Sequence, residues 1–125
     1  MNASALETDL RTLQVLADQP QLNQRELALQ LGVSLGKANY CLKALLAKGF
    51  LIARNFKNNK NKLAYAYVLT PAGITARAEL TVEFLQVKKA EYERLRAEID
   101  ALQAQAVRDE VTSHALVLGS KVSQV

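Results

Sequence analysis

NQRELALQLGVSLGKANYCLKALLA, residues 23–47, has the pattern of two short helices joined by a tight turn. Asn23 and Glu26 have the spacing of a capping box, in which each side chain bonds the backbone of the other residue at the start of a helix. Gly32 can adopt the left-handed conformation that ends a helix, and Ser34 is a favourable N-cap for the next one. This spacing is typical of a helix-turn-helix, although ordinary helical bundles also contain it.

The second helix of this pair has two chemically different faces when its residues are placed about 100° apart. One face is apolar and is expected to pack on the two preceding helices: Leu35, Ala38, Leu42, Leu45, Leu46 and Gly49. The other face contains no acid, and its lysines, amide and phenol suit contacts with phosphates and base edges in a major groove. The residues predicted to contact DNA there are Lys37, Asn39, Tyr40 and Lys43. A solvated helix face that is basic by coincidence is the alternative.

Residues 50–69 have the composition of two strands joined by a basic loop. Residues 50–56 and 63–69 are rich in apolar, aromatic and β-branched side chains, which favour strands. The loop reads KNNKNK, and its lysines are expected to reach phosphates or a minor groove: Lys57, Lys60 and Lys62. A solubilising loop is the alternative, but such loops usually include acids. Helix, turn, helix and hairpin in this order predict a winged helix-turn-helix, with Arg54 as a further DNA contact on the hairpin.

The charges of the 125-residue chain are unevenly distributed. The net charge is only +4, yet residues 34–78 carry eight Lys and Arg and no acid. Residues 1–33 have a net charge of −2 and residues 79–110 a net charge of −3. A long segment without a carboxylate predicts a polyanionic partner, most often nucleic acid. A membrane surface is the weaker interpretation, because the segment has neither a basic amphipathic helix nor a lipidation signal.

Several other classes of protein are not expected. The N-terminus lacks the layout of a secretory signal and no apolar run approaches ~18 residues, so we expect a cytoplasmic protein that does not enter a membrane. With one cysteine, Cys41, and one histidine, the chain is expected to have neither an internal disulfide nor a metal site. The absence of phosphate-loop and nucleophile-elbow motifs argues against an enzyme, and no cofactor is expected. Cys41 is expected to be a packing residue, with a thiol sensor activated by nearby lysines as the alternative.

Two further helices flank this region. The pattern at Ser4–Glu7 is that of a capping box and predicts a first helix that ends near Asp18. Thr70-Pro71 predicts the start of a long helix over 71–108, and residues 109–125 are expected to form a frayed or disordered tail. The long helix carries an apolar stripe with alternating steps of three and four residues, and the predicted dimer contacts are Leu85, Tyr92, Leu95, Ile99 and Leu102.

A domain of about seventy residues, here 1–70, cannot cover so long a stripe. We therefore expect a coiled-coil-like homodimer that places two recognition helices about one turn of DNA apart. A helix folded back on its own domain is the alternative, but it accounts only for residues 74–84.

Several motifs resemble those of a known family. LGVS at 31–34, LKALLAKGF at 42–50 and YVLTPAG at 67–73 resemble the DNA-binding core of MarR-type winged-helix transcriptional regulators. NYCLKAL at 39–45 and KNKLAYAY at 60–67 are similar to a short subfamily associated with exopolysaccharide gene clusters. The resemblance covers about residues 5–105.

This resemblance implies binding of duplex DNA by a homodimer, with a recognition helix from Ser34 to Lys43 and a wing from Arg54 to Lys62. The single long C-terminal helix departs from the family and argues against the ligand pocket of its larger members, so a small-molecule effector is not expected. The competing function is a winged-helix scaffold that recruits a different protein through its C-terminal helix, and the acid-free segment argues against it.

Overall fold

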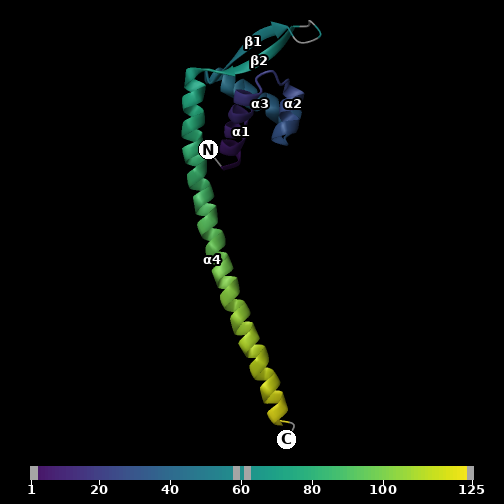
Figure 1. The fold of residues 1–125 in the computed structure, drawn as a ribbon, viewed down its shortest axis with the longest axis vertical. Coiled ribbons are helices and arrows are strands. Elements are labelled where there is room, and N and C mark those ends of the chain that lie inside the picture. Colours follow the sequence, from purple (N-terminus) through teal and green to yellow (C-terminus); the bar gives the residue numbers. More distant parts are fainter. Residues whose placement is uncertain (1–2, 58–59, 61–62, 124–125) are drawn as a thin grey trace. The chain divides into compact units, whose positions relative to one another are not determined.

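A computed structural model of the chain describes residues 3–57, 60 and 63–123 (Figure 1). The order of elements is α1 (Ala3–Asp18), α2 (Gln24–Leu31), α3 (Leu35–Ala47), β1 (Leu51–Lys57), β2 (Leu63–Leu69) and α4 (Pro71–Ser123). The chain divides into two compact units, Met1–Gln86 and Val87–Val125. The predicted fold class, mostly helical with a small hairpin and a long C-terminal helix, is confirmed.

The turn between α2 and α3 is built as the sequence predicts. The Asn23 side chain accepts a hydrogen bond from the Glu26 backbone N–H at 2.8 Å, and the Asn23 N–H donates to the Glu26 carboxylate at 3.2 Å. Gly32 has φ of 68°, a left-handed conformation that few other residues adopt without cost. The Ser34 hydroxyl then accepts from the backbone N–H of Lys37 at 3.1 Å and caps α3. The helix-turn-helix is therefore fixed by local hydrogen bonds at each end of the turn.

The start of α1 differs from the prediction. The helix already includes Ala3, so Ser4 lies inside the first turn and the capping box predicted at Ser4–Glu7 is wrong. A residue inside the helix has lost the extended backbone that an N-cap requires. The Ser4 carbonyl instead accepts a hydrogen bond from the hydroxyl of Thr8 at 2.9 Å.

The core of the first unit is made mainly of leucines from the three short helices. Leu13 and Leu16 of α1 meet residues of α2, α3, β1 and the first turns of α4; the other members of the buried cluster are Leu27, Leu31, Leu42, Leu45, Leu51 and Ala76. Burial of each leucine contributes about 1.5–3 kcal/mol. The Arg11 guanidinium donates to the carbonyls of Gln30 and Leu31 at the end of α2, at 3.1 and 2.9 Å. This contact satisfies backbone acceptors that a helix end leaves open.

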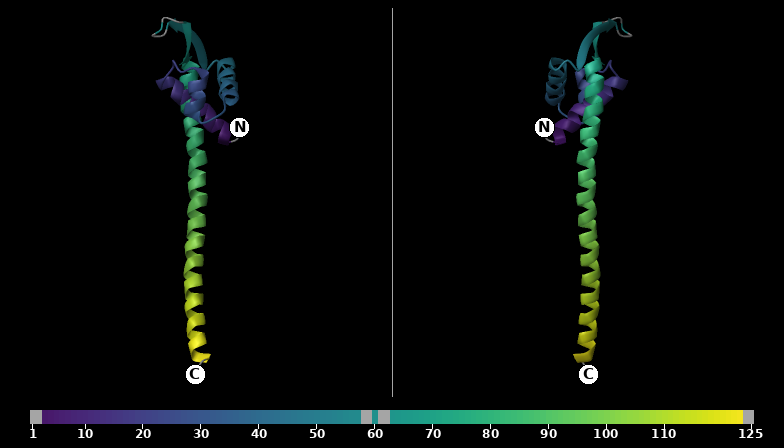
Figure 2. Two further views of the ribbon diagram at one scale, coloured as in Figure 1. Left: turned by 90° about the vertical axis from the view of Figure 1, so that its right-hand side faces the viewer. Right: turned by 90° about the vertical axis from the view of Figure 1, so that its left-hand side faces the viewer.

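The hairpin is a two-stranded antiparallel sheet in which Leu51 pairs with Leu69 and Lys57 pairs with Leu63. Its base is attached to the helices, because Leu51 is buried in the core and the Tyr67 N–H donates to the Pro20 carbonyl at 2.9 Å. Figures 1 and 2 show α1, α2 and α3 clustered at this base while the other end of the hairpin projects past them. β2 matches the predicted range, whereas β1 begins and ends one residue later than predicted, so that Lys57 is the last residue of the strand and not part of the loop.

The connection from β2 into α4 is closely packed. Thr70 caps α4 as predicted, since its hydroxyl accepts from the Gly73 N–H at 3.0 Å and also bonds the Gly49 carbonyl. The Thr70 N–H donates to the Phe50 carbonyl at 3.1 Å. A Cβ atom on Gly73 would lie 2.0 Å from that same Phe50 oxygen. Glycine at position 73 is therefore required by a close backbone approach.

In the unit Val87–Val125, the helix α4 continues to Ser123 instead of ending at residue 108, so the residues expected as a tail are helical from 109 to 123. Valine and threonine in this part disfavour a helix by only a few tenths of a kcal/mol each and Gly119 by about 1 kcal/mol, and no proline interrupts it. Among the described residues, no helix is both long and apolar enough to cross a membrane.

Candidate nucleic-acid interface

The exposed face of α3 presents most of the groups predicted to contact DNA. Lys37, Tyr40 and Lys43 are exposed, with a relative exposure of 75% for Tyr40, and Asn39 is half-buried on the flank. Ser34 is exposed while its hydroxyl oxygen caps the helix, which leaves its O–H available as a donor. These residues therefore form a continuous acid-free surface along one side of α3.

Leu35 is the exception to the predicted packing of α3. It was expected on the core face, yet it is 46% exposed. Ala38 and Leu42, on the same side of the helix, are buried. As the first residue of α3, Leu35 lies beside an open groove instead of beneath another helix.

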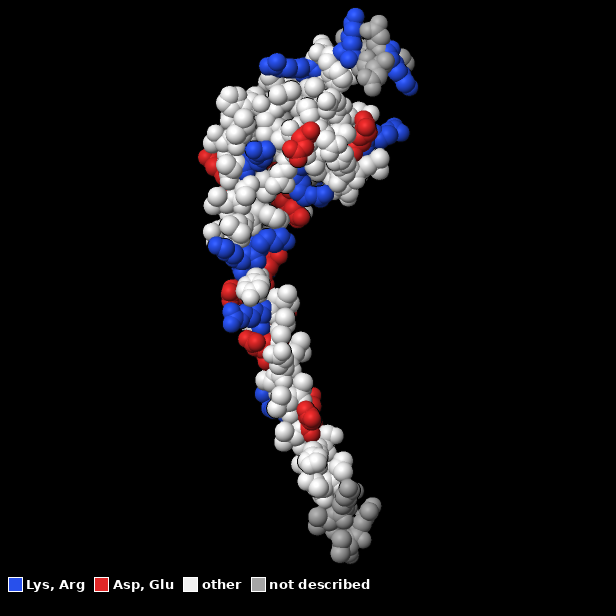
Figure 3. Space-filling view, viewed as in Figure 1, with Lys and Arg blue, Asp and Glu red and all other residues white. Residues whose placement is uncertain are grey.

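The predicted basic residues of the hairpin divide between its two faces. Arg54 and Lys57 are both exposed, but they are three residues apart in a strand and so point to opposite sides. Lys57 shares its side with Tyr65, which is opposite Asn55 in the register. Lys60 is exposed in the turn, and Lys62 lies outside the described residues. On the face seen in Figure 3, Lys and Arg side chains follow the hairpin while the helices below carry both signs of charge.

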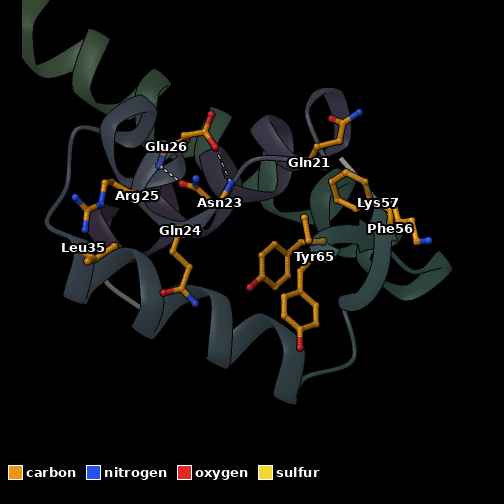
Figure 4. Close-up of a pocket in the computed structure, with 11 residues that line it drawn as sticks. Gln21, Asn23, Gln24, Arg25, Glu26, Leu35, Phe56, Lys57 and Tyr65 are labelled. Carbon is orange, nitrogen blue, oxygen red and sulfur yellow. Dashed lines mark hydrogen bonds between the residues drawn. The ribbon is translucent and has the colours of Figure 1, made fainter. Parts of the chain in front are cut away.

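A groove of about 1010 Å³ separates the start of α2 from the hairpin (Figure 4). Its described lining residues are Gln21, Asn23, Gln24, Arg25, Glu26, Leu35, Phe56, Lys57, Ala64, Tyr65 and Tyr67. Of these, Glu26 alone is acidic, and its carboxylate is held by the capping box. The groove can thus accept a phosphate backbone between two cations, Arg25 on the helix and Lys57 on the hairpin.

Lys57 is the one residue of this groove that was predicted to contact DNA, and three further candidate contacts were not predicted. Gln24 and Arg25 are early residues of α2, and Tyr65 is 60% exposed on β2. For Tyr65 the sequence did contain an indication: in YAY, residues 65–67, tyrosines alternate with alanine, which places both rings on one side of a strand.

Cys41 is a packing residue, as expected. It is buried, and burial raises the pKa of its thiol, with the charge of Asp9 adding to the effect and that of Lys37 opposing it. A raised thiol pKa disfavours the thiolate, so it argues against the alternative of a thiol activated by neighbouring lysines. The described residues also contain no group of His, Cys, Asp and Glu side chains close enough to hold a metal ion.

A family comparison agrees with this geometry. Residues 6–52 match the family described as winged helix-turn-helix DNA-binding. The matched segment contains α1, α2 and α3 and enters β1. The fold is that of a winged helix-turn-helix domain, and the family that matches it is described as DNA-binding, which is not an enzymatic activity. No curated protein matches the chain.

Several solved structures share the fold. The PcaV transcriptional regulator from Streptomyces coelicolor, solved with its natural ligand, has a TM-score of 0.59 at 19% identity over 80% of this chain and 70% of its own. TA0346 from Thermoplasma acidophilum has a TM-score of 0.62 at 21% identity, covering 74% and 93%. MepR, a regulator of the Staphylococcus aureus efflux pump MepA, has a TM-score of 0.50 at 18% identity, covering 78% and 77%.

Proposed function

We propose that the protein is a MarR-type transcriptional regulator that binds double-stranded DNA as a homodimer. The observation that carries the proposal is the acid-free, exposed face of α3 beside a basic hairpin. In helix-turn-helix proteins the second helix of the pair enters the major groove, and here α3 is that helix. PcaV and MepR, which share the fold, are transcriptional regulators.

In this interface the contacts divide by chemistry. Lys37 and Lys43 suit phosphates, while the Asn39 amide can bond adenine in a bidentate way. Arg25 and Lys57 hold the backbone in the groove between α2 and the hairpin. Phosphate contacts set the position of the domain, and base contacts set its sequence preference.

Selection of bound sequences from a random DNA pool tests the proposal. We expect enrichment of a pseudo-palindrome whose half-sites are about 10 base pairs apart from centre to centre. A pool that stays random after several rounds contradicts sequence-specific binding and favours the protein-scaffold function instead.

The homodimer is proposed from the apolar side of α4. The predicted contact residues are between 45% and 68% exposed in the single chain: Leu85, Tyr92, Leu95, Ile99 and Leu102. In the unit Val87–Val125, three of them line one shallow groove together with Arg96. Exposed apolar side chains at three- and four-residue steps favour coverage by a second helix.

A pair of matched variants tests the dimer. Leu95→Glu places a charge within the apolar stripe, whereas Ala97→Glu places the same charge about 200° further round the helix. Sedimentation equilibrium at micromolar concentration is expected to show a dimer for the wild type and for Ala97→Glu, and a monomer for Leu95→Glu. A monomeric wild-type protein contradicts the paired half-sites.

The regulation of exopolysaccharide genes is a finer proposal that rests on the resemblance of residues 39–45 and 60–67. Its test is a gel-shift comparison between DNA upstream of exopolysaccharide genes and unrelated promoters of equal length from the same genome. Equal affinity for both sets contradicts this part of the proposal while leaving DNA binding intact.

A further inference from the structure

Leu35 is an apolar side chain without a structural role in the core. It is the first residue of α3, and 46% of it is exposed. In α3, all of whose residues the structure describes, the other large apolar side chain left exposed is Tyr40, which carries a hydroxyl. Ser34 and Gly36 on either side of Leu35 are exposed as well. The first turn of α3 therefore presents a leucine to the surroundings.

The position of Leu35 limits what it can meet. In a helix-turn-helix, the N-terminal residues of the second helix are the ones that contact base edges. Leu35 also lines the groove between α2 and the hairpin, together with Gln24 and Tyr65 (Figure 4). An added methyl on Gly36 would meet nothing within 4 Å, so the surface around Leu35 is open to close approach.

The chemistry of leucine limits which groups of DNA its side chain can recognise. Its side chain has neither a hydrogen-bond donor nor an acceptor, so it cannot distinguish the polar edges of bases or bind phosphate. In the major groove the apolar group that a base pair presents is the C5-methyl of thymine. Contact with this methyl removes apolar surface of both partners from water.

We propose that Leu35 is a specificity-determining residue that contacts the C5-methyl of a thymine in each half-site. The inference rests on the proposed function, because it requires α3 to lie in the major groove. It predicts that one thymine of the half-site is distinguished by its methyl group alone.

Deoxyuridine substitution tests the contact directly, since it removes the methyl and leaves base pairing unchanged. In the sequence enriched from the random pool, each thymine of the half-site is replaced in turn, and the Kd is measured by fluorescence anisotropy. We expect one position to weaken binding by about fourfold per half-site, the effect of one buried methyl group. The Leu35→Ala variant is expected to bind thymine-containing DNA more weakly and to lose its sensitivity to deoxyuridine at that position.

Leu29→Ala is the matched control, because Leu29 is 78% exposed on α2 and is not among the residues that line the groove. It is expected to keep the affinity and the deoxyuridine sensitivity of the wild type. Leu35→Gln, which keeps the length of the side chain but adds an amide, is expected to lose the preference for the methyl as well. Circular dichroism of each variant confirms that the fold is retained.

The outcomes separate this inference from the proposed function. If the random pool yields no enriched sequence, that result contradicts DNA recognition itself. An enriched sequence in which no thymine is sensitive to deoxyuridine, or in which both Leu35 variants keep the full sensitivity of the wild type, overturns the role of Leu35 and leaves DNA binding in place.

Discussion

Replacement of Gly73 by alanine is expected to destabilise the first unit strongly. The new Cβ would lie 2.0 Å from the Phe50 carbonyl oxygen, and real Cβ contacts essentially never fall below 3.0 Å. The backbone must therefore shift by at least about 1 Å. The Thr70 N–H bond to the same oxygen and the Gly73 N–H bond to the Thr70 hydroxyl would be stretched by this shift.

The size of the effect follows from these contacts. Overpacking typically costs about 1–3 kcal/mol, and each weakened hydrogen bond adds about 1 kcal/mol. We expect a loss of about 3 kcal/mol in the free energy of unfolding, which lowers the Tm by about 12–24 °C for a domain of this size. Because the chain has no tryptophan, unfolding in urea is followed by tyrosine fluorescence, and three of the four tyrosines lie in the first unit.

Gly36→Ala is the matched control. Gly36 lies in α3, where an added methyl meets nothing within 4 Å, and alanine favours a helix over glycine by up to about 1 kcal/mol. This variant is expected to be as stable as the wild type or more stable, at the same protein concentration. A Gly73→Ala protein within about 0.5 kcal/mol of the wild type would refute the backbone contact.

Three further predictions concern charge and capping. Lys57→Ala is expected to reduce the magnitude of the slope of log K against log salt by about 0.9 for each subunit of the bound homodimer, about 1.8 in total, while Lys57→Arg keeps it; an unchanged slope for the alanine variant excludes a phosphate contact. Asn23→Ala is expected to cost about 1 kcal/mol in urea unfolding, and Asn23→Ser to recover most of it, because serine also caps helices. Burial raises the pKa of the Asp9 carboxyl, with Lys48 opposing the shift, so the stability linked to Asp9 is greatest at low pH and declines as pH rises through the raised pKa. Asp9→Asn is therefore expected to be more stable than the wild type near neutral pH, with the difference vanishing below the ordinary aspartate pKa of about 3.9; a variant less stable at neutral pH contradicts the assignment.

The parts of the fold that could be predicted are those that local chemistry determines. Asn23 with Glu26, Gly32 and Ser34 each form the cap that their residue type favours, because the partners are within a few residues of one another. The hairpin was predictable because strand and turn compositions differ sharply along residues 50–69.

The environments of Leu35, Tyr65 and Gly73 could not be predicted, because they depend on neighbours that are distant in sequence. A helical wheel places Leu35 on the same side of α3 as the buried residues, but it does not show whether another element covers the first turn of the helix. The groove between α2 and the hairpin leaves this first turn uncovered. Arg25 and Tyr65 line one groove although they are distant in sequence, and the hydrogen bond from the Tyr67 N–H to the Pro20 carbonyl helps to hold the hairpin near the start of α2. Gly73 likewise showed no signal, since its partner is the backbone of Phe50.

The separation of charge in the first unit affects how the protein approaches DNA as well as how it binds. Residues 1–33 are net negative, whereas the acid-free residues 34–78 supply α3 and the hairpin. The unit therefore has an electric dipole, and the field of a polyanion exerts a torque that turns the α3 and hairpin side forward before contact. Fewer encounters are then wasted in the wrong orientation, so association is faster than for a protein with the same net charge evenly mixed. Acids that do not contact DNA contribute to this orientation through the long-range field. Salt that shortens the Debye length to about 10 Å or less screens that field and removes the gain in association rate.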